Sequence, residues 1–183
     1  MGWLYQHKPY GMSASEFLRN EFSNENFEVL DVAVVKFREA YIALRHKKTN
    51  EVFCVICLLD YRPHDYYNFG YKDMDETMHP YAYNCPERIL KQLTPTDNEN
   101  ANQWRAVCWE RIQRRSKKVN NGDIIKFKYP LSFTDGTVED TFRVLKDGRA
   151  VRFESARKAY SPVFRIKGWR DMDFEIIKKE EIM

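Results

Sequence analysis

The segment from Asp60 to Pro86 constrains the fold of this chain more than any other. It shows neither the alternation of a strand nor the period of a helix, and it is rich in acidic residues. Connections longer than about 12–15 residues are uncommon in compact domains unless they are functional or disordered. Disordered segments contain few aromatic residues, and this one contains Tyr61, Tyr66, Tyr67, Phe69, Tyr71, Tyr81 and Tyr83. We therefore predict an ordered loop over residues 60–86 that packs on a domain and presents a binding surface.

Tyrosine and acidic side chains of this loop form the first candidate site. Tyrosine is enriched in interface cores because its ring gives a large contact area and loses little entropy on ordering. Nothing in the loop matches a known reaction motif, so we predict contact with another macromolecule. The candidate partner-binding residues are Tyr66, Tyr67, Tyr71, Asp73, Asp75 and Glu76. The alternative is that these rings complete the core of the domain itself.

The residues around the loop predict an α+β domain over residues 1–118, with an antiparallel sheet and flanking helices. β-branched and alternating apolar residues indicate the strands. Ser13 and Glu16 match a capping box at the start of a helix, and Pro86 suits the first turn of another. The predicted strands cover residues 3–5, 27–37, 40–46 and 52–59, and the predicted helices cover residues 14–22, 87–93 and 99–116.

Residues 119–183 have the pattern of a small all-β module. Asp135-Gly136 and Asp147-Gly148 are dipeptides that favour the positive φ angles of tight hairpin turns. Short apolar segments recur around these turns, as they do in small sandwiches and barrels. We predict a second domain over residues 119–183 that folds as a small SH3-like β-barrel.

Charge is distributed unevenly along the chain. Residues 1–100 contain 11 basic and 15 acidic residues, whereas residues 101–183 contain 19 basic and 12 acidic residues. Arginine alternates with apolar residues in the predicted strands of the second domain, which predicts a basic outer face suited to a nucleic-acid backbone. The candidate nucleic-acid-binding residues are Arg111, Arg114, Arg115, Lys117, Lys118, Arg152, Arg165 and Lys167. The alternative is an ordinary solvated face, because a pI near 8.6 is low for a nucleic-acid-binding domain.

Metal binding and catalysis have weaker support in the sequence. Cys54 and Cys57 lie in one predicted strand, where positions three apart point to opposite faces. We therefore expect all four cysteines to be buried thiols in a reducing compartment. The loop offers an alternative set of ligands for a divalent ion, as in a metal-dependent nuclease: His64, Asp65, Asp73, Asp75, Glu76, His79 and Cys85. No phosphate-binding or catalytic motif occurs, and we expect no metal, no cofactor and no enzymatic activity.

The hydropathy pattern bears on location. No apolar run approaches the roughly 18–20 residues that span a bilayer. The N-terminal residues also lack the basic and apolar regions of a secretory signal. We expect no membrane contact and a cytoplasmic location.

Two segments of the sequence are distinctive: FGYKDMDETM at residues 69–78 and CPERILKQLTP at residues 85–95. Shorter distinctive stretches lie at residues 1–4, 7–13, 104–108, 122–127 and 133–136, so the set is distributed along most of the chain. As a set, they resemble a family of small, largely uncharacterised proteins carried by bacterial phages and mobile elements. His79 departs from the family pattern, which has glycine before this proline.

The resemblance implies a function but no catalytic residue. The mobile-element setting and the size are similar to those of anti-CRISPR proteins, some of which inhibit Cas9-type nucleases. By this resemblance, we expect a non-enzymatic inhibitor that binds a Cas9-type nuclease, with its guide RNA or DNA, in a bacterial host cell. Such nucleases hold the heteroduplex in a positively charged channel, where Asp73, Asp75 and Glu76 would compete. The runner-up is a nucleic-acid-binding accessory protein of a mobile element.

Overall fold

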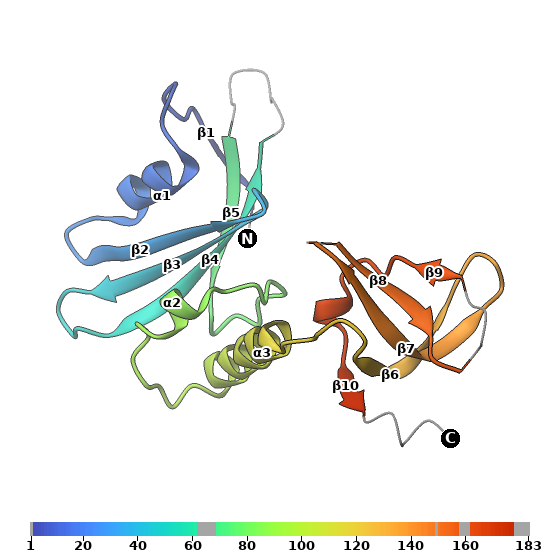
Figure 1. Cartoon of the computed structure of the whole chain (residues 1–183). Helices are drawn as coiled ribbons and strands as arrows, with labels where there is room; N and C mark the ends of the chain where they lie inside the picture. The colour runs from blue at the N-terminus through green and yellow to red at the C-terminus, as the bar shows by residue number, and fades with distance from the viewer. Residues whose placement is uncertain (1, 62–68, 149, 158–161, 178–183) are drawn as a thin grey trace. The chain divides into compact units, whose positions relative to one another are not determined.

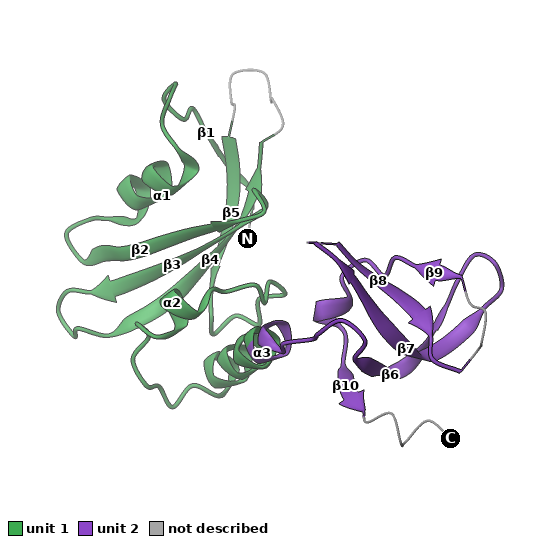
Figure 2. Ribbon diagram, viewed as in Figure 1, with its two compact units in different colours: residues 1–112 green, residues 113–183 purple. Residues whose placement is uncertain are grey.

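A computed structural model describes residues 2–61, 69–148, 150–157 and 162–177. The chain divides into two compact units, residues 1–112 (unit 1) and residues 113–183 (unit 2), which Figure 2 distinguishes by colour. The sequence predicts a division after residue 118, which lies just beyond the helix that contains the structural boundary. Each unit contains one antiparallel sheet, so the predicted α+β class is confirmed.

Unit 1 is built on a five-stranded antiparallel sheet with the strand order β1-β5-β4-β3-β2. Its strands are β1 (Leu4–Gln6), β2 (Phe27–Val35), β3 (Glu39–His46), β4 (Val52–Asp60) and β5 (Phe69–Asp75). Strands β2, β3 and β4 form the predicted meander, and β1 is the predicted edge strand (Figure 1). The apolar strand β4 lies at the centre of the sheet, where both of its faces are covered.

The prediction of one continuous loop over residues 60–86 is wrong, because strand β5 lies within it. This strand pairs with β4 on one side and with β1 on the other. Phe69 and Tyr71 pack into the core on one face of the sheet, and Met74 packs into the core on the other. Glycine, lysine and aspartate are depleted in strands, and they occupy the intervening positions, which hides the alternation in the sequence.

Each face of the unit 1 sheet has its own core. Helix α1 (Ala14–Phe22) covers one face, with Phe17 and Leu18 against Ile42 and Phe69. Helices α2 (Glu87–Leu90) and α3 (Glu99–Ser116) supply Ile89 and Trp104 to the other core. Burial of apolar side chains on both faces of one sheet is the main stabilising contribution in such a domain.

Local capping explains where the helices begin. The backbone N–H of Glu16 donates to Oγ of Ser13 at 3.1 Å, which confirms the predicted N-cap of α1. The N–H of Ala101 donates to Oδ1 of Asn98 at 3.0 Å, so Asn98 caps the start of α3. Helix α2 ends at Leu90, shorter than the predicted range of 87–93.

Unit 2 contains a second five-stranded antiparallel sheet, with the order β10-β6-β7-β8-β9. Its elements are β6 (Ile124–Ser132), β7 (Val138–Asp147), β8 (Ala150–Ser155), β9 (Val163–Phe164), the short 3-10 helix η1 (Trp169–Asp171) and β10 (Phe174–Ile177). Phe127, Phe142, Phe153 and Trp169 form an aromatic core on one face. Among the described residues, the end strands β9 and β10 do not pair with each other, so the ladder is open there.

None of the helices among the described residues is both long enough and apolar enough to cross a membrane.

Candidate functional site

The predicted partner-binding residues do not form one exposed surface. Tyr66 and Tyr67 lie outside the described residues. Tyr71 is buried against α1, and burial and the nearby Glu21 raise the pKa of its phenol. Asp73 and Asp75 are half-buried on β5, and Oδ1 of Asp75 accepts from the N–H of Thr77 at 2.8 Å. The prediction that Tyr71 meets a partner is therefore wrong.

Glu76 is also misassigned, because it is a buried structural residue. Its carboxylate forms a bidentate ion pair with Arg105 of α3, with Nε–Oε2 at 2.7 Å and Nη2–Oε1 at 2.6 Å. Arg105 also donates to the carbonyl of Thr94 at 2.6 Å. Charged side chains are buried in this way only when they are paired and hydrogen-bonded. Glu76 is therefore held by the fold and is not available to a basic channel.

The structure brings three exposed aromatic residues together at the end of strand β4. We call this site the aromatic groove, and it is a hollow of about 840 Å³ lined by Trp3, Phe37, Arg38, Glu39, Leu58, Leu59, Asp60 and Tyr61. Trp3, Phe37 and Tyr61 are 42%, 77% and 39% exposed. Tryptophan, tyrosine and phenylalanine are the residues that interfaces favour, so their grouping marks a candidate contact surface.

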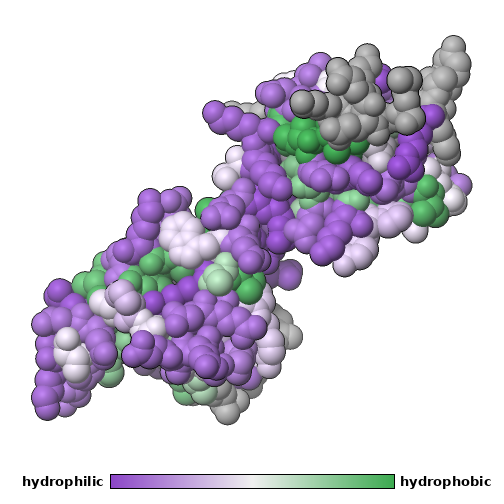
Figure 3. Space-filling view, turned by 90° about the horizontal axis from the view of Figure 1, so that it is seen from below, coloured by the Kyte–Doolittle hydropathy of each residue, from purple (hydrophilic) through white to green (hydrophobic). Residues whose placement is uncertain are grey.

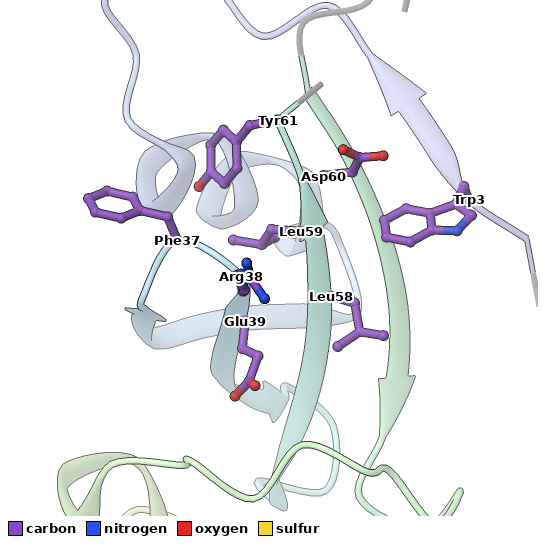
Figure 4. Close-up of a pocket in the computed structure, with 8 residues that line it drawn as sticks. All are labelled: Trp3, Phe37, Arg38, Glu39, Leu58, Leu59, Asp60 and Tyr61. Atoms are coloured by element: carbon purple, nitrogen blue, oxygen red, sulfur yellow. The ribbon is translucent and has the colours of Figure 1, made fainter. Parts of the chain in front are cut away.

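Strand β4 divides the groove. Figure 4 shows Phe37, Leu59 and Tyr61 on one side of the strand and Trp3, Leu58 and Asp60 on the other. The alternation of side chains along β4 causes this division. The ladder between β3 and β4 ends at Glu39 and Leu58, and beyond it the Leu59 N–H donates to the Arg38 carbonyl at 2.8 Å. The aromatic groove lies where this ladder ends.

The turn that presents Phe37 has an unfavourable backbone conformation. Lys36 and Phe37 have φ angles of 51° and 55° between β2 and β3. Two positive φ angles in a hairpin turn favour Asn-Gly or Asp-Gly, and a bulky residue there costs about 1–3 kcal/mol. The phenyl ring is largely exposed, and among the described rings it makes an edge contact with Tyr61, with centroids 6.5 Å apart. Strain of this kind at an exposed aromatic residue is typical of functional surfaces.

The other side of the groove depends on close packing of β1 on β5. The Tyr5 ring lies on Gly70, where an added Cβ would approach Cε1 of the ring to 2.4 Å. Trp3 stacks on Tyr5 with ring centroids 6.1 Å apart. The Tyr5 hydroxyl lies 3.5 Å from Oδ2 of Asp60, a buried residue. Gly70 therefore positions Trp3 through Tyr5.

Three other exposed aromatic residues of the described chain lie away from the groove. Figure 3 shows one face of the molecule that is mostly hydrophilic, with hydrophobic residues in small separate areas. Tyr10, Tyr81 and Tyr129 are highly exposed, but none of them lines the aromatic groove. Scattered exposed apolar residues are ordinary on protein surfaces, so the grouping and not the exposure distinguishes the groove.

The predicted nucleic-acid-binding residues fall into two groups. In the first group, ion pairs or backbone bonds within unit 2 occupy the side chains. Nε of Arg114 lies 2.9 Å from Oδ1 of Asp173, Arg115 pairs with Asp171, and Nζ of Lys117 donates to the Phe174 carbonyl at 2.8 Å. Arg111, in unit 1, is half-buried. These residues have structural partners that the sequence pattern does not reveal.

The second group consists of exposed basic residues. It contains Lys118, Arg152, Arg165 and Lys167. No ion pair is formed by any of them among the residues that the structure describes. Arg143, on the same outer face as Arg152, pairs instead with Glu154 at 3.6 Å. The basic surface of unit 2 is therefore smaller than the sequence predicts.

The four cysteines are buried free thiols, as predicted. Cys54 and Cys57 belong to the cores on opposite faces of the sheet, which confirms that they do not form a chelating pair. Burial raises the pKa of the Cys108 thiol to about 12 and raises the pKa of Cys54 and Cys57 as well. Thiols in this state are weak nucleophiles and poor metal ligands at neutral pH.

The alternative metal site is not assembled where the structure can be described. His64 and Asp65 lie outside the described residues, and Glu76 is held by Arg105. Elsewhere in the described ranges, no three His, Cys, Asp or Glu side chains are placed to share an ion. His79 is exposed and has a φ angle of 51°, a conformation that glycine adopts readily.

Sequence reasoning misses Trp3 and Phe37. Trp3 precedes β1 and Phe37 lies in the turn after β2, whereas the sequence predicts that both residues belong to strands. The available signal is Lys36-Phe37-Arg38 between the two strands, since a three-residue hairpin connection without glycine or asparagine is unusual.

Comparison with known proteins gives one similarity. Residues 95–169 match a family model described as a domain of unknown function, DUF6927. The match covers less than half of the chain and includes all of α3 and the strands β6 to β9. No curated protein and no solved structure matches the chain.

Proposed function

We propose that this protein is a non-enzymatic binding protein that docks on another protein through the aromatic groove of unit 1. The observation that carries the proposal is the grouping of exposed Trp3, Phe37 and Tyr61 around one hollow, with Phe37 in a strained turn. Aromatic anchors at the centre of a surface supply most of the binding energy in many interfaces. The partner-binding residues proposed from the structure replace the buried Tyr71 and Glu76.

The proposed partner is a Cas9-type RNA-guided nuclease, inside a bacterial host cell. This narrower proposal is supported by the resemblance of the sequence to small phage and mobile-element proteins, and the groove supplies a contact surface that does not depend on acidic residues. In this account, docking on the nuclease blocks its action without any covalent step. Asp73 and Asp75 contribute at most a secondary charge, because both are half-buried on β5.

Affinity capture tests the proposal together with its surface. Tagged protein is expressed in cells that contain a type II CRISPR system, and plasmid interference is scored alongside capture. We expect the native protein to retain the nuclease and to reduce interference, whereas a Trp3→Ala/Phe37→Ala variant should lose both effects. A Tyr10→Ala variant is the matched control, because Tyr10 is an exposed ring of the same unit outside the groove. Equal capture by the groove variant and the control would contradict the docking surface.

A nucleic-acid-binding accessory protein of a mobile element is the second proposal. It is supported by the exposed basic residues of unit 2 that have no ion pair among the described residues. Direct, salt-sensitive binding of DNA or RNA by the isolated protein would favour it. A metal-dependent nuclease is a third proposal, for which cleavage of a plasmid with added Mg²⁺ is the test, and no described cluster of ligands favours it.

For unit 2, we also propose a small SH3-like barrel. The last strand, β10, returns to pair with the first strand, β6, so that the five strands curl around one aromatic core. Small barrels of this type likewise bring the last strand back beside the first.

A further inference from the structure

Unit 2 contains a pocket whose charged residues are all basic. The hollow, which we call the basic pocket, has a volume of about 410 Å³ and lies beside the turn between β9 and η1. Arg165, Lys167 and Arg170 supply the charges, and Val151, Ile166 and Trp169 supply the apolar surface. All of its lining residues are described, and none of them is aspartate or glutamate. A concave site of one charge sign concentrates counter-ions of the opposite sign.

Arg170 is held in place by the fold. Its Nη1 donates to the carbonyls of Arg115 and Lys117, both at 3.1 Å. The guanidinium also lies over the Trp169 ring, 4.4 Å from the centroid. These contacts fix one positive charge at the pocket before any ligand arrives, and a group fixed in advance loses less entropy on binding.

Arg165 and Lys167 differ from the other basic residues of unit 2 in their partners. Both are exposed, and neither makes a hydrogen bond or ion pair within the parts of the chain that the structure describes. Arg114, Arg115 and Arg157, in contrast, are neutralised by nearby carboxylates. The pocket therefore combines one oriented cation with two cations that are available to a ligand.

The positive charge continues from the pocket along the strands. Phe153 of β8 pairs with Phe164 of β9, so Arg152 and Arg165 flank the same end of this strand pair. Both phenylalanines point into the core, and the alternation of side chains places the two arginines on the outer face. A row of charge that extends beyond one pocket suits a ligand with several phosphates in line and not a single small anion.

We propose that the basic pocket binds the phosphodiester backbone of a nucleic-acid strand, with Arg165 and Lys167 as direct phosphate contacts and Arg170 as a positioned third cation. Trp169 is buried, with 8% of the residue exposed, so its indole orients Arg170 and does not stack on a base. Recognition is consequently of the backbone and carries no base preference. The proposal concerns unit 2 alone, and its outcome is independent of docking through the groove of unit 1.

The test is fluorescence anisotropy of the full chain with a labelled 20-nucleotide single strand, a duplex of the same sequence, and inorganic tripolyphosphate as a competitor. An Arg165→Ala/Lys167→Ala variant should bind the strand about tenfold more weakly at low salt, and the slope of log affinity against log salt should fall by about 1.4. A Lys126→Ala/Lys128→Ala variant removes the same charge from another part of unit 2 and should change affinity less.

The competing outcomes are distinct. If the two double variants weaken oligonucleotide binding equally, the attraction is a diffuse one to the basic unit. That result would contradict the assignment of binding to the pocket. Tight binding of tripolyphosphate without binding of either oligonucleotide would overturn the backbone assignment, since it would indicate a small-anion site. No binding of any probe by the native chain at 50 mM salt would reject the inference outright. Circular dichroism of both variants checks that the fold is retained.

Discussion

Glu76 and Arg105 form a bidentate ion pair inside unit 1, between the end of β5 and helix α3. The side chain of Glu76 is 2% exposed and that of Arg105 is 14% exposed. The backbone N–H of Cys54 also faces Oε1 of Glu76 at 3.4 Å. This pair joins the sheet to the helix. Glu76, which the sequence places on a binding surface, is therefore a structural residue.

Removing the Glu76 charge should therefore affect stability. Glu76→Gln leaves the Arg105 guanidinium buried without its carboxylate, and breaking one partner of a buried pair costs about 3–5 kcal/mol. Urea denaturation at pH 7 should show this loss as a lower transition midpoint. Glu110→Gln is the matched control, because Glu110 is an exposed acid on the same helix. A midpoint within error of the native protein would mean that the pair contributes little.

The packing of Tyr5 on Gly70 gives a second prediction. In Gly70→Ala, the new Cβ would meet the Tyr5 ring, so β1 must shift or the ring must rotate away. Overpacking of this kind typically costs about 1–3 kcal/mol. The same substitution should cost less in a Tyr5→Ala background, and denaturation of all four members of the cycle measures the coupling. Gly2→Ala should be neutral, because nothing lies within 4 Å of the added Cβ.

Phe37 should show opposite effects on stability and on binding. Asparagine tolerates positive φ better than phenylalanine, so Phe37→Asn should relieve part of the strain and raise or preserve the free energy of unfolding. Loss of the exposed ring should at the same time weaken partner capture. Thermal unfolding and capture measured on the same preparation provide the test. A variant that is clearly destabilised would show that the ring is structural.

Three buried thiols should make the protein sensitive to alkali. The pKa of Cys108 is raised from 9.0 to about 12, and Cys54 and Cys57 shift in the same direction. Between pH 9 and about pH 12, the native state retains thiol protons that the unfolded chain loses. The contribution of these thiols to the free energy of unfolding is therefore complete below about pH 9 and declines as the pH rises. Urea denaturation at pH 7, 9 and 10.5 should show the decline. At neutral pH, a disulfide reagent that exchanges with free thiols should react with all four cysteines only after the protein unfolds.

The sequence predicts much of the fold because the signals are local. The β-branched residues of 27–35, 39–46 and 52–60 and the cap at Ser13 are enough to place the meander and α1. Strand β5 is missed because its pairing with β4 and β1 comes from tertiary contacts, and its glycine and aspartates contradict strand propensity.

The candidate site is less predictable than the fold. Trp3, Phe37 and Tyr61 come from three separate segments, and the pairing of β1 with β5, of β5 with β4 and of β4 with β3 brings them to one hollow. Likewise, the ion pairs of Arg114 and Arg115 depend on Asp171 and Asp173, more than 50 positions further along the chain. Ion pairs and burial that depend on such distant residues cannot be predicted from the local sequence composition.

The central claim, that the aromatic groove docks on a Cas9-type nuclease and inhibits it, is tested most directly by a cleavage assay with purified components. Cleavage of a target plasmid by the guide-loaded nuclease is measured over a concentration series of the native protein, the Trp3→Ala/Phe37→Ala variant and the Tyr10→Ala control. The account predicts inhibition by the native protein and the control, and at least about tenfold weaker inhibition by the groove variant, since loss of hot-spot rings typically costs about 2 kcal/mol or more. Undiminished cleavage in the presence of excess native protein, or equal inhibition by the groove variant, would contradict it.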